Sequence, residues 1–312
     1  MNPQANAKHI SSFKNHTMRV QIGDICCAIS CGDISIFDGL QKLFNNFLTD
    51  QPADISIELS VSEQLSPSEM EASLSEMRYI HEGNHFLPTS RIIASNYDLD
   101  NRTISMCIER NPGNPGLDLK LLNQLLYLAY YSAWKLRNNG NPRALLVHAC
   151  GILHNGKALV FTGPSEAGKT TIANLCREQN GEVINDEMLL ISRPEQHDSV
   201  LEVRGIPIIG GHPQRLNATA PLSCILLLKQ SNKTRIRSIN RTEAYLRFIR
   251  QIITPSYIGL IDKRSVLSLM ADFTDEVTGT IPIYELEFSL DRESLWWEIG
   301  KLERALEGED IK

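Results

Sequence analysis

The most informative absence in this sequence is that of a long apolar run. Its apolar stretches are far too short to span a bilayer. Residues 1–16 are polar and lack the apolar segment of a secretory signal. We therefore expect a cytoplasmic protein with no membrane partner.

Cysteine pairs and an excess of positive charge are also missing. The seven cysteines include no C-x-x-C pair and no zinc-type spacing, and an odd number without a signal indicates reduced thiols. Cys26, Cys27 and Cys31 are close enough in sequence to suggest a metal, but buried strand positions are the better interpretation. The net charge of −6 argues against a general nucleic-acid binder, which would usually be basic.

What the sequence does have is an ordinary globular composition, with 42% hydrophobic and 22% charged residues over 312 positions. That length suits two domains. The clearest break lies at 111–116, where two Pro-Gly pairs fall within Asn-Pro-Gly-Asn-Pro-Gly. We predict a small β-rich (α+β) N-terminal domain at 1–116 and an α/β domain at 117–312.

The N-terminal domain is expected to consist mainly of strands and to carry no recognisable chemistry. Alternating or β-prone apolar residues predict strands at 18–22, 25–29, 55–61, near 91–95 and at 103–109. Apolar residues at helical spacing predict a helix at 36–48, although Gly39 weakens that prediction.

The second domain begins with a predicted long helix at 117–136, which has a wide apolar face. Strands follow at 144–149 and 158–162, joined by a turn at Asn155-Gly156. A buried strand is predicted within 221–228. A helix capped by Asp291 is predicted up to residue 306, with Trp296 and Trp297 as packing residues.

Residues 163–171 read Gly-Pro-Ser-Glu-Ala-Gly-Lys-Thr-Thr and match the pattern G-x-x-x-x-G-K-[ST]. A β-prone apolar run precedes them and residues at helical spacing follow, which is the order that a phosphate-binding loop requires. Backbone N–H groups would face the phosphates, Lys169 would reach the β- and γ-phosphates, and the Thr170 hydroxyl would bind Mg²⁺. A glycine-rich turn that only resembles such a loop is the alternative.

Two further pairs of charged residues follow the loop. Asp186 and Glu187 come at the end of a short apolar run, where a Mg²⁺-ATP site needs an acidic group. A solvated strand end is the other interpretation. Glu202 and Arg204 alternate with apolar neighbours and would share one face of a strand, where an exposed ion pair is the structural alternative.

These segments together resemble the HPr kinase/phosphorylase family, within the wider P-loop group that includes phosphoenolpyruvate carboxykinase. The matching features are a strand histidine before the loop, His148, then the loop itself, then the acidic pair Asp186-Glu187. A signature of the type L-E-(I/V)-R-G-(I/L)-G-I-I follows, matched here by 201–209 with Pro207 in place of the second glycine. The resemblance covers about 117–312 and implies an α/β P-loop kinase domain of the HPr kinase/phosphoenolpyruvate carboxykinase type.

The resemblance implies ATP and Mg²⁺ as cofactors. Thr170 and Glu202 would bind Mg²⁺, and Glu187, where the family usually has a second Asp, is a third candidate metal ligand. The ATP-binding residues would be Gly163, Pro164, Ser165, Glu166, Ala167, Gly168, Lys169, Thr170 and Thr171.

The resemblance also implies a catalytic set. Asp186 would be the general base that accepts the proton of a substrate hydroxyl, with His148 nearby. Lys169 would act on the phosphates, and Arg204 lies in a stretch important for catalysis. The activity expected is that of an ATP-dependent kinase acting on a serine of a protein or peptide. A regulatory nucleotide-binding module without transfer activity and a small-molecule kinase are the alternatives.

The C-terminal part of the sequence differs from that of the bifunctional family members. Bifunctional family members carry a basic, glycine-containing segment that residues 281–291 do not match, so phosphorylase activity is not expected. The chain is more similar to HPr-kinase-related proteins found beside peptide-maturation genes.

The basic stretch 229–250 is either a groove for an acidic peptide or, as we prefer, a solvated face. The resemblance also suggests a homo-oligomer.

Overall fold

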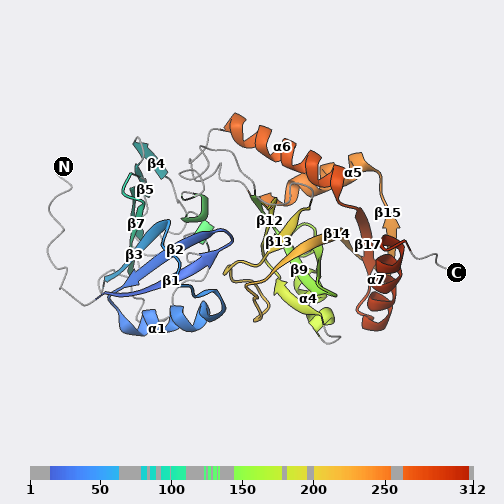
Figure 1. Ribbon diagram of the computed structural model, residues 1–312, viewed down its shortest axis with the longest axis horizontal. Helices are drawn as coiled ribbons and strands as arrows, with labels where there is room; N and C mark the ends of the chain where they lie inside the picture. Colours follow the sequence, from blue (N-terminus) through green and yellow to red (C-terminus); the bar gives the residue numbers. More distant parts are fainter. Residues whose placement is uncertain are drawn as a thin grey trace, which may run out of the picture. The chain divides into compact units, whose positions relative to one another are not determined.

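A computed structural model of the chain divides it into two compact units (Figure 1). The first unit comprises Met1–Val20 and Cys26–Asp118, and the second comprises Gln21–Ile25 and Leu119–Lys312. The structure describes residues 15–62, 79–82, 85–88, 93–98, 100–109, 123, 126–127, 129–131, 133, 144–177, 181–194, 200–253 and 263–308. The predicted boundary at 116–117 lies outside these residues and stays a prediction.

The N-terminal part of the chain builds a seven-stranded sheet with the order β1-β2-β3-β7-β6-β5-β4. The pairs β2–β3 and β3–β7 are parallel, whereas β7–β6, β6–β5 and β5–β4 are antiparallel. The strands are β1 (His16–Ile22), β2 (Ile25–Cys31), β3 (Ile55–Ser62), β4 (Tyr79–Glu82), β5 (His85–Pro88), β6 (Ile93–Asp98) and β7 (Thr103–Glu109).

One helix, α1 (Ile34–Leu43), joins β2 to a 3₁₀ turn at Asn45–Phe47 and then to β3. It begins at Asp33, whose side chain accepts hydrogen bonds from the backbone N–H groups of Ser35 and Ile36. The helix buries Phe37 and Leu40, which lie three residues apart and therefore on one face. Cys26, Cys27 and Cys31 are buried in β2, as the sequence predicts.

The second unit contains a ten-stranded sheet, in which eight strands have the order β11-β9-β10-β14-β13-β12-β8-β16, while β17 pairs with β14 and β15 pairs with β17. The long strand β14 pairs in parallel with β10 and β17 and antiparallel with β13. The strands are β8 (Ala144–Val147), β9 (Ala149–His154), β10 (Lys157–Thr162), β11 (Glu182–Asn185), β12 (Leu189–Ser192), β13 (Glu202–Arg204), β14 (Thr219–Gln230), β15 (Arg235–Ser238), β16 (Ile252–Ile253) and β17 (Ile283–Phe288).

Helices cover the two faces of this sheet (Figure 1). The helices α5 (Arg241–Phe248) and α6 (Lys263–Thr280) contribute to one apolar cluster, and α4 (Lys169–Arg177) and α7 (Arg292–Leu306) contribute to the other. Strand β10 contributes residues to both clusters, because its side chains alternate between the two faces of the sheet. Ala158 and Val160 belong to the first cluster, and Leu159 and Phe161 to the second.

The directions of three neighbouring strands bring the predicted site residues to one edge of the sheet. Strand β9 lies between β10 and β11 and is antiparallel to both. Strands β10 and β11 therefore run in the same direction and end where β9 begins. Gly163 follows β10, Asp186 follows β11 and His148 precedes β9, so the three positions meet at this edge.

Most of the predicted elements that fall within the described residues occur in the structure. The helix predicted at 36–48 is shorter, because α1 ends at Leu43 and a 3₁₀ turn follows. Of the long helix predicted at 117–136, the described residues from Asn123 to Ala133 are helical. The eighteen-residue helix α6 was not predicted.

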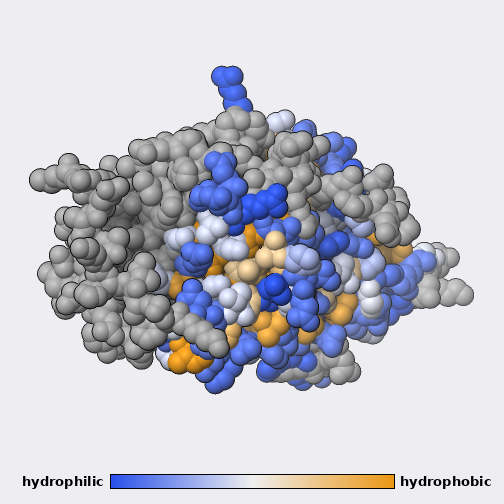
Figure 2. Space-filling view, turned by 60° about the vertical axis from the view of Figure 1, so that its left-hand side comes forward, coloured by the Kyte–Doolittle hydropathy of each residue, from blue (hydrophilic) through white to orange (hydrophobic). Residues whose placement is uncertain are grey.

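The described surface is mostly polar. In the face shown in Figure 2, hydrophilic residues dominate the described surface and hydrophobic ones lie scattered among them. Within the described part of the chain, each helix is too short or too polar to cross a membrane.

Candidate functional site

The loop between β10 and α4 adopts a tight conformation that depends on glycine. Glu166 has a φ of 65° and Gly168 a φ of 107°, both in the left-handed region. A Cβ atom at Gly168 would lie 2.5 Å from Cζ of Phe288. The loop is closed by a hydrogen bond from the Ala167 N–H to the Pro164 carbonyl, and the helix begins with one from Ile172 to Gly168. Strand, glycine loop and helix therefore follow in the predicted order.

Lys169 lies inside this loop and is 7% exposed. Its ammonium donates hydrogen bonds to the carbonyl oxygens of Gly163 and Pro164, both at 3.1 Å. Burial lowers the pKa of Lys169, while the nearby Glu187 opposes this shift. The loop thus holds a partly desolvated cation at the end of the strand, where an anion would be attracted.

Thr170 contacts Asp186 directly across the strand edge. The Thr170 hydroxyl donates to Oδ2 of Asp186 at 2.7 Å, and the His212 N–H donates to the same oxygen at 2.9 Å. Asp186 is 1% exposed, and its other oxygen, Oδ1, is buried without a hydrogen-bond partner among the described residues.

Hydroxyl and carboxylate oxygens are the ligands that Mg²⁺ prefers, so Thr170 and Asp186 fit a magnesium ion. Mg²⁺ usually keeps several waters and takes only one or two protein ligands. The described residues contain no group of three or more His, Cys, Asp or Glu side chains that could hold a metal. A metal at this edge would therefore depend on Thr170, Asp186 and a bound phosphate.

His148 and Glu187 form the more open side of the site. The His148 Nε2 lies 3.7 Å from Oε1 of Glu187, and the two side chains are 24% and 40% exposed. Burial, together with the charge of Lys169, lowers the pKa of His148 to about 4. Burial and the neighbouring Asp186 raise the pKa of Glu187. Near neutral pH this contact therefore involves a neutral imidazole and is not an ion pair.

Glu202 and Arg204 lie on one face of β13, as the sequence predicts. Their side chains are 3.5 Å apart and about a quarter exposed. Within the described residues, no hydrogen bond or ion pair joins either of them to the loop or to Asp186. The structure thus brings together Lys169, Thr170, Asp186, Glu187 and His148, whereas the metal role of Glu202 and the catalytic role of Arg204 stay predictions.

Asn185 is a site residue that sequence reasoning missed. Its side chain is fully buried and makes four hydrogen bonds. The amide nitrogen donates to the carbonyls of Ile206 and Ile208, and the amide oxygen accepts from the N–H groups of Glu187 and Met188. Asn185 thus fixes the turn that carries the two acidic residues. Its only sequence signal was a polar residue inside an apolar run.

The segment from Gly205 to Leu216 was recognised only as far as residue 209, through the signature at 201–209, and its contact with the acidic pair was not predicted. It has no regular secondary structure and packs against the acidic pair. A Cβ at Gly210 would lie 2.2 Å from Oδ1 of Asp186, and one at Gly211 would lie 3.3 Å from Oγ1 of Thr170. A side chain at Gly210 would collide with the Asp186 carboxylate, and one at Gly211 would require Thr170 to shift slightly. The Gly-Gly pair was the available signal.

The basic stretch 229–250 is largely neutralised by carboxylates. Glu287, which is 3% exposed, pairs with Lys229, Arg235 and Arg237. Hydrogen bonds from these cations lower the pKa of Glu287 to about 2. Arg247 bonds Glu285 at 2.7 Å. This pairing favours a solvated, internally compensated face over a groove for an acidic peptide.

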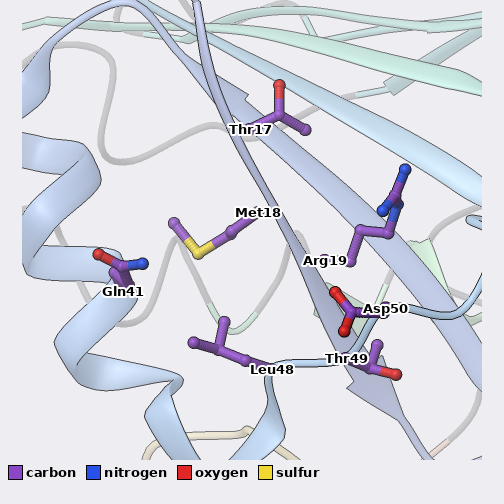
Figure 3. A pocket seen from close by; sticks show the side chains of 7 residues that line it. All are labelled: Thr17, Met18, Arg19, Gln41, Leu48, Thr49 and Asp50. Carbon is purple, nitrogen blue, oxygen red and sulfur yellow. The ribbon is translucent and has the colours of Figure 1, made fainter.

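A surface cavity lies elsewhere, in the first unit (Figure 3). It has a volume of about 390 Å³ and lies between β1, α1 and the segment after the 3₁₀ turn, with Arg19, Gln41 and Asp50 among its lining residues. None of the predicted site residues lines it.

Comparisons with known proteins add little to this picture. No protein-family model matches the chain, and no curated protein does. Among solved structures, the Hpr(Ser) kinase/phosphatase from Coxiella burnetii is similar at 10% sequence identity and a TM-score of 0.29. The match covers 53% of this chain and 99% of that one. A score this low carries no argument about fold or function. The architecture on its own is mixed α/β.

Proposed function

We propose that this chain binds ATP with Mg²⁺ and transfers the γ-phosphate to a serine hydroxyl of a protein or peptide. The observation that supports the proposal is the junction of the loop with the acidic turn. There Lys169 is enclosed by the loop, and Thr170, the next residue, bonds the buried carboxylate of Asp186 at 2.7 Å. Phosphoryl transfer requires mainly positioning and neutralisation of charge, and this junction offers the groups for both.

In this proposal the two acidic residues have different tasks. Asp186 holds the metal with Thr170, because it is 1% exposed and its Oδ2 already accepts two hydrogen bonds. Glu187 accepts the proton, because its side chain is 40% exposed and its pKa is raised. The sequence-based interpretation gave the base role to Asp186, and the difference in exposure is the reason for the change.

The proposed reaction balances with these groups. The serine oxygen bonds to the γ-phosphorus while the bond from that phosphorus to the β-phosphate oxygen breaks, and ADP leaves. The serine proton passes to the Glu187 carboxylate. Lys169 offsets the negative charge of the phosphates, and the neutral His148 borders Glu187 at 3.7 Å.

The choice of a serine in a protein or peptide rests on the sequence resemblance alone. Residues 148, 163–171, 186–187 and 201–209 carry that resemblance. Phosphorylase activity is not part of the proposal, because residues 281–291 lack the basic, glycine-containing segment. The cations that follow β14 are paired internally, so an acidic peptide is not the preferred acceptor.

Mass spectrometry of acceptors after incubation with Mg²⁺-ATP tests the proposal. The acceptors are HPr and serine-containing peptides encoded by neighbouring genes, and Glu187→Gln is the matched variant. We expect the wild type to add one phosphate, and the variant to bind ATP without transferring it. Tight ATP binding without transfer would favour a regulatory module or a small-molecule acceptor, and absence of ATP binding would refute the proposal.

A further inference from the structure

His212 has a tautomer that its surroundings determine. Its Nδ1 accepts a hydrogen bond from the N–H of Gln214 at 3.1 Å. In a neutral imidazole one nitrogen accepts and the other carries the proton. The proton of neutral His212 is therefore on Nε2, which makes Nε2 a hydrogen-bond donor.

That donor has no partner among the described residues. His212 is 1% exposed, and its Nε2 is buried without a hydrogen bond. Buried polar groups in folded proteins nearly always have a partner, so an unmet N–H at this position calls for a water molecule or a ligand. The mechanism described above does not use His212.

A second unmet atom, of the opposite kind, belongs to the residue that His212 contacts. The His212 N–H bonds Oδ2 of Asp186, while Oδ1 of Asp186 is a buried acceptor without a partner. A carboxylate oxygen without a donor is suited to a cation, and an N–H without an acceptor is suited to an anion. A metal–phosphate group offers a cation and an anion together.

The chain around His212 is held by hydrogen bonds on both sides of a pair of glycines. Asn123 holds Ile209 with two hydrogen bonds at 2.8 and 2.9 Å, and the N–H of Leu216 bonds the carbonyl of Ile184. Between these two anchors lie Gly210 and Gly211, whose backbone is the most adaptable. We call residues 210–214 the glycine flap.

We propose that the Nε2–H of His212, which the glycine flap carries, binds the terminal phosphate of the nucleotide. This inference rests on the proposed binding of Mg²⁺-ATP. The terminal phosphate is the one concerned, because a metal held by Thr170 bridges the β- and γ-phosphates in loops of this kind. His212 thereby joins Lys169 as a phosphate-binding residue contributed by a different segment.

Two substitutions test the roles of the two ring nitrogens of His212 separately. His212→Asn keeps an oxygen near the Nδ1 position to accept from Gln214 and removes the donor at Nε2. His212→Gln places an amide nitrogen near Nε2 and restores a donor there. Isothermal titration calorimetry with Mg²⁺-ATP and Mg²⁺-ADP is the measurement, and thermal melting shows that each variant is folded.

We expect His212→Asn to weaken ATP binding by roughly 10- to 100-fold, the range for a hydrogen bond to a charged group, with a smaller effect on ADP. His212→Gln should recover most of the loss. ATP affinity equal to wild type in His212→Asn would mean that a buried water meets Nε2, and would refute the inference. Equal losses for ATP and ADP in both variants would also refute it, because they indicate a purely structural role. A wild type that binds no nucleotide would overturn the proposed function itself.

Discussion

Lys169 is a cation held almost out of solvent, with two backbone carbonyls as hydrogen-bond partners in place of a carboxylate. Such a group is costly to bury unless an anion joins it. The acidic residues that oppose the lowering of its pKa, Glu187 and Asp186, follow the end of β11, which β9 separates from β10. A phosphate bound by the loop would give Lys169 the anion that it lacks, and a cation such as Mg²⁺ would then offset the repulsion between that phosphate and these acids.

Replacing Lys169 by alanine should weaken Mg²⁺-ATP binding by roughly 10- to 100-fold, because it removes a charged hydrogen-bond donor to the phosphates. Isothermal titration calorimetry measures the change. Lys157→Ala is the matched control, since Lys157 begins β10, the strand that leads into the loop, and pairs at the surface with Glu307. Equal affinity in wild type and Lys169→Ala would contradict a phosphate-binding role for the loop.

His148 and Glu187 should each make the free energy of unfolding depend on pH, and the two dependences should have opposite signs. The pKa of His148 is about 4 in the folded protein, below the ordinary value of 6.5. The unfolded chain therefore binds more protons between these values, and this contribution to stability is lost as the pH falls from 6.5 towards 4. Glu187 has a raised pKa, so its contribution is lost as the pH rises through that pKa.

Urea unfolding between pH 4 and 7 tests this linkage. His148→Asn should flatten the fall in stability below pH 6.5, by no more than about 1.4 kcal/mol per pH unit, the slope for one proton. Glu187→Gln should have the opposite effect and steepen the fall at low pH. An unchanged pH profile in His148→Asn would show that His148 titrates alike in both states.

At the scale of elements, the sequence predicted the parts of the site that local patterns encode. The apolar run of β10, the glycine loop and the helical spacing of α4 are contiguous, and each obeys a short-range rule. Asp186 and Glu187 were recognised because an apolar run ends there. The cap of α7 by Asp291 was predicted from a short-range pattern and occurs in the structure, whereas Trp297, predicted as a packing residue, is 66% exposed.

The parts that the sequence did not predict depend on contacts between distant segments. Asn185 and His212 gain their importance from the segment 205–216, which has no periodicity and returns to the strand edge only in the folded chain. The sheet order that places β9 between β10 and β11 is likewise a long-range property. Helix α6 was missed because its polar residues and Gly279 obscure the helical pattern.

The contact between β11 and the segment 205–216 should depend strongly on the side chain of Asn185. Asn185→Ala removes four hydrogen bonds and leaves buried N–H and C=O groups without partners. We expect a loss of roughly 2–4 kcal/mol in the free energy of unfolding, at about 1 kcal/mol for each bond, together with weaker Mg²⁺-ATP binding. Urea denaturation and calorimetric titration measure the two effects.

Asn217→Ala is the control for this experiment, because Asn217 is exposed and directly follows this segment. It should change the free energy of unfolding by no more than about 0.5 kcal/mol. If Asn185→Ala matched this control in both measurements, the side chain of Asn185 would not hold the acidic turn in place.

At the scale of the whole molecule, all the chemistry that we assign belongs to the second unit. The loop, the acidic turn and the glycine flap lie within residues 119–312. The first unit has its own sheet and its own buried residues, including Ile57, which is 1% exposed. A nucleotide should therefore stabilise the second unit alone if the two units unfold independently.

Differential scanning calorimetry with and without Mg²⁺-ATP tests this expectation in the full chain. At a nucleotide concentration 100 times its Kd, the second unit should gain about 2.7 kcal/mol, which raises its Tm by roughly 5–10 °C. Ile57→Ala, which creates a cavity in the first unit, should lower the other transition and so identify it. Lys169→Ala should reduce the nucleotide shift and leave both transitions in place. A shift of the transition that Ile57→Ala lowers, or of both transitions together, would show that nucleotide binding does not act on the second unit alone.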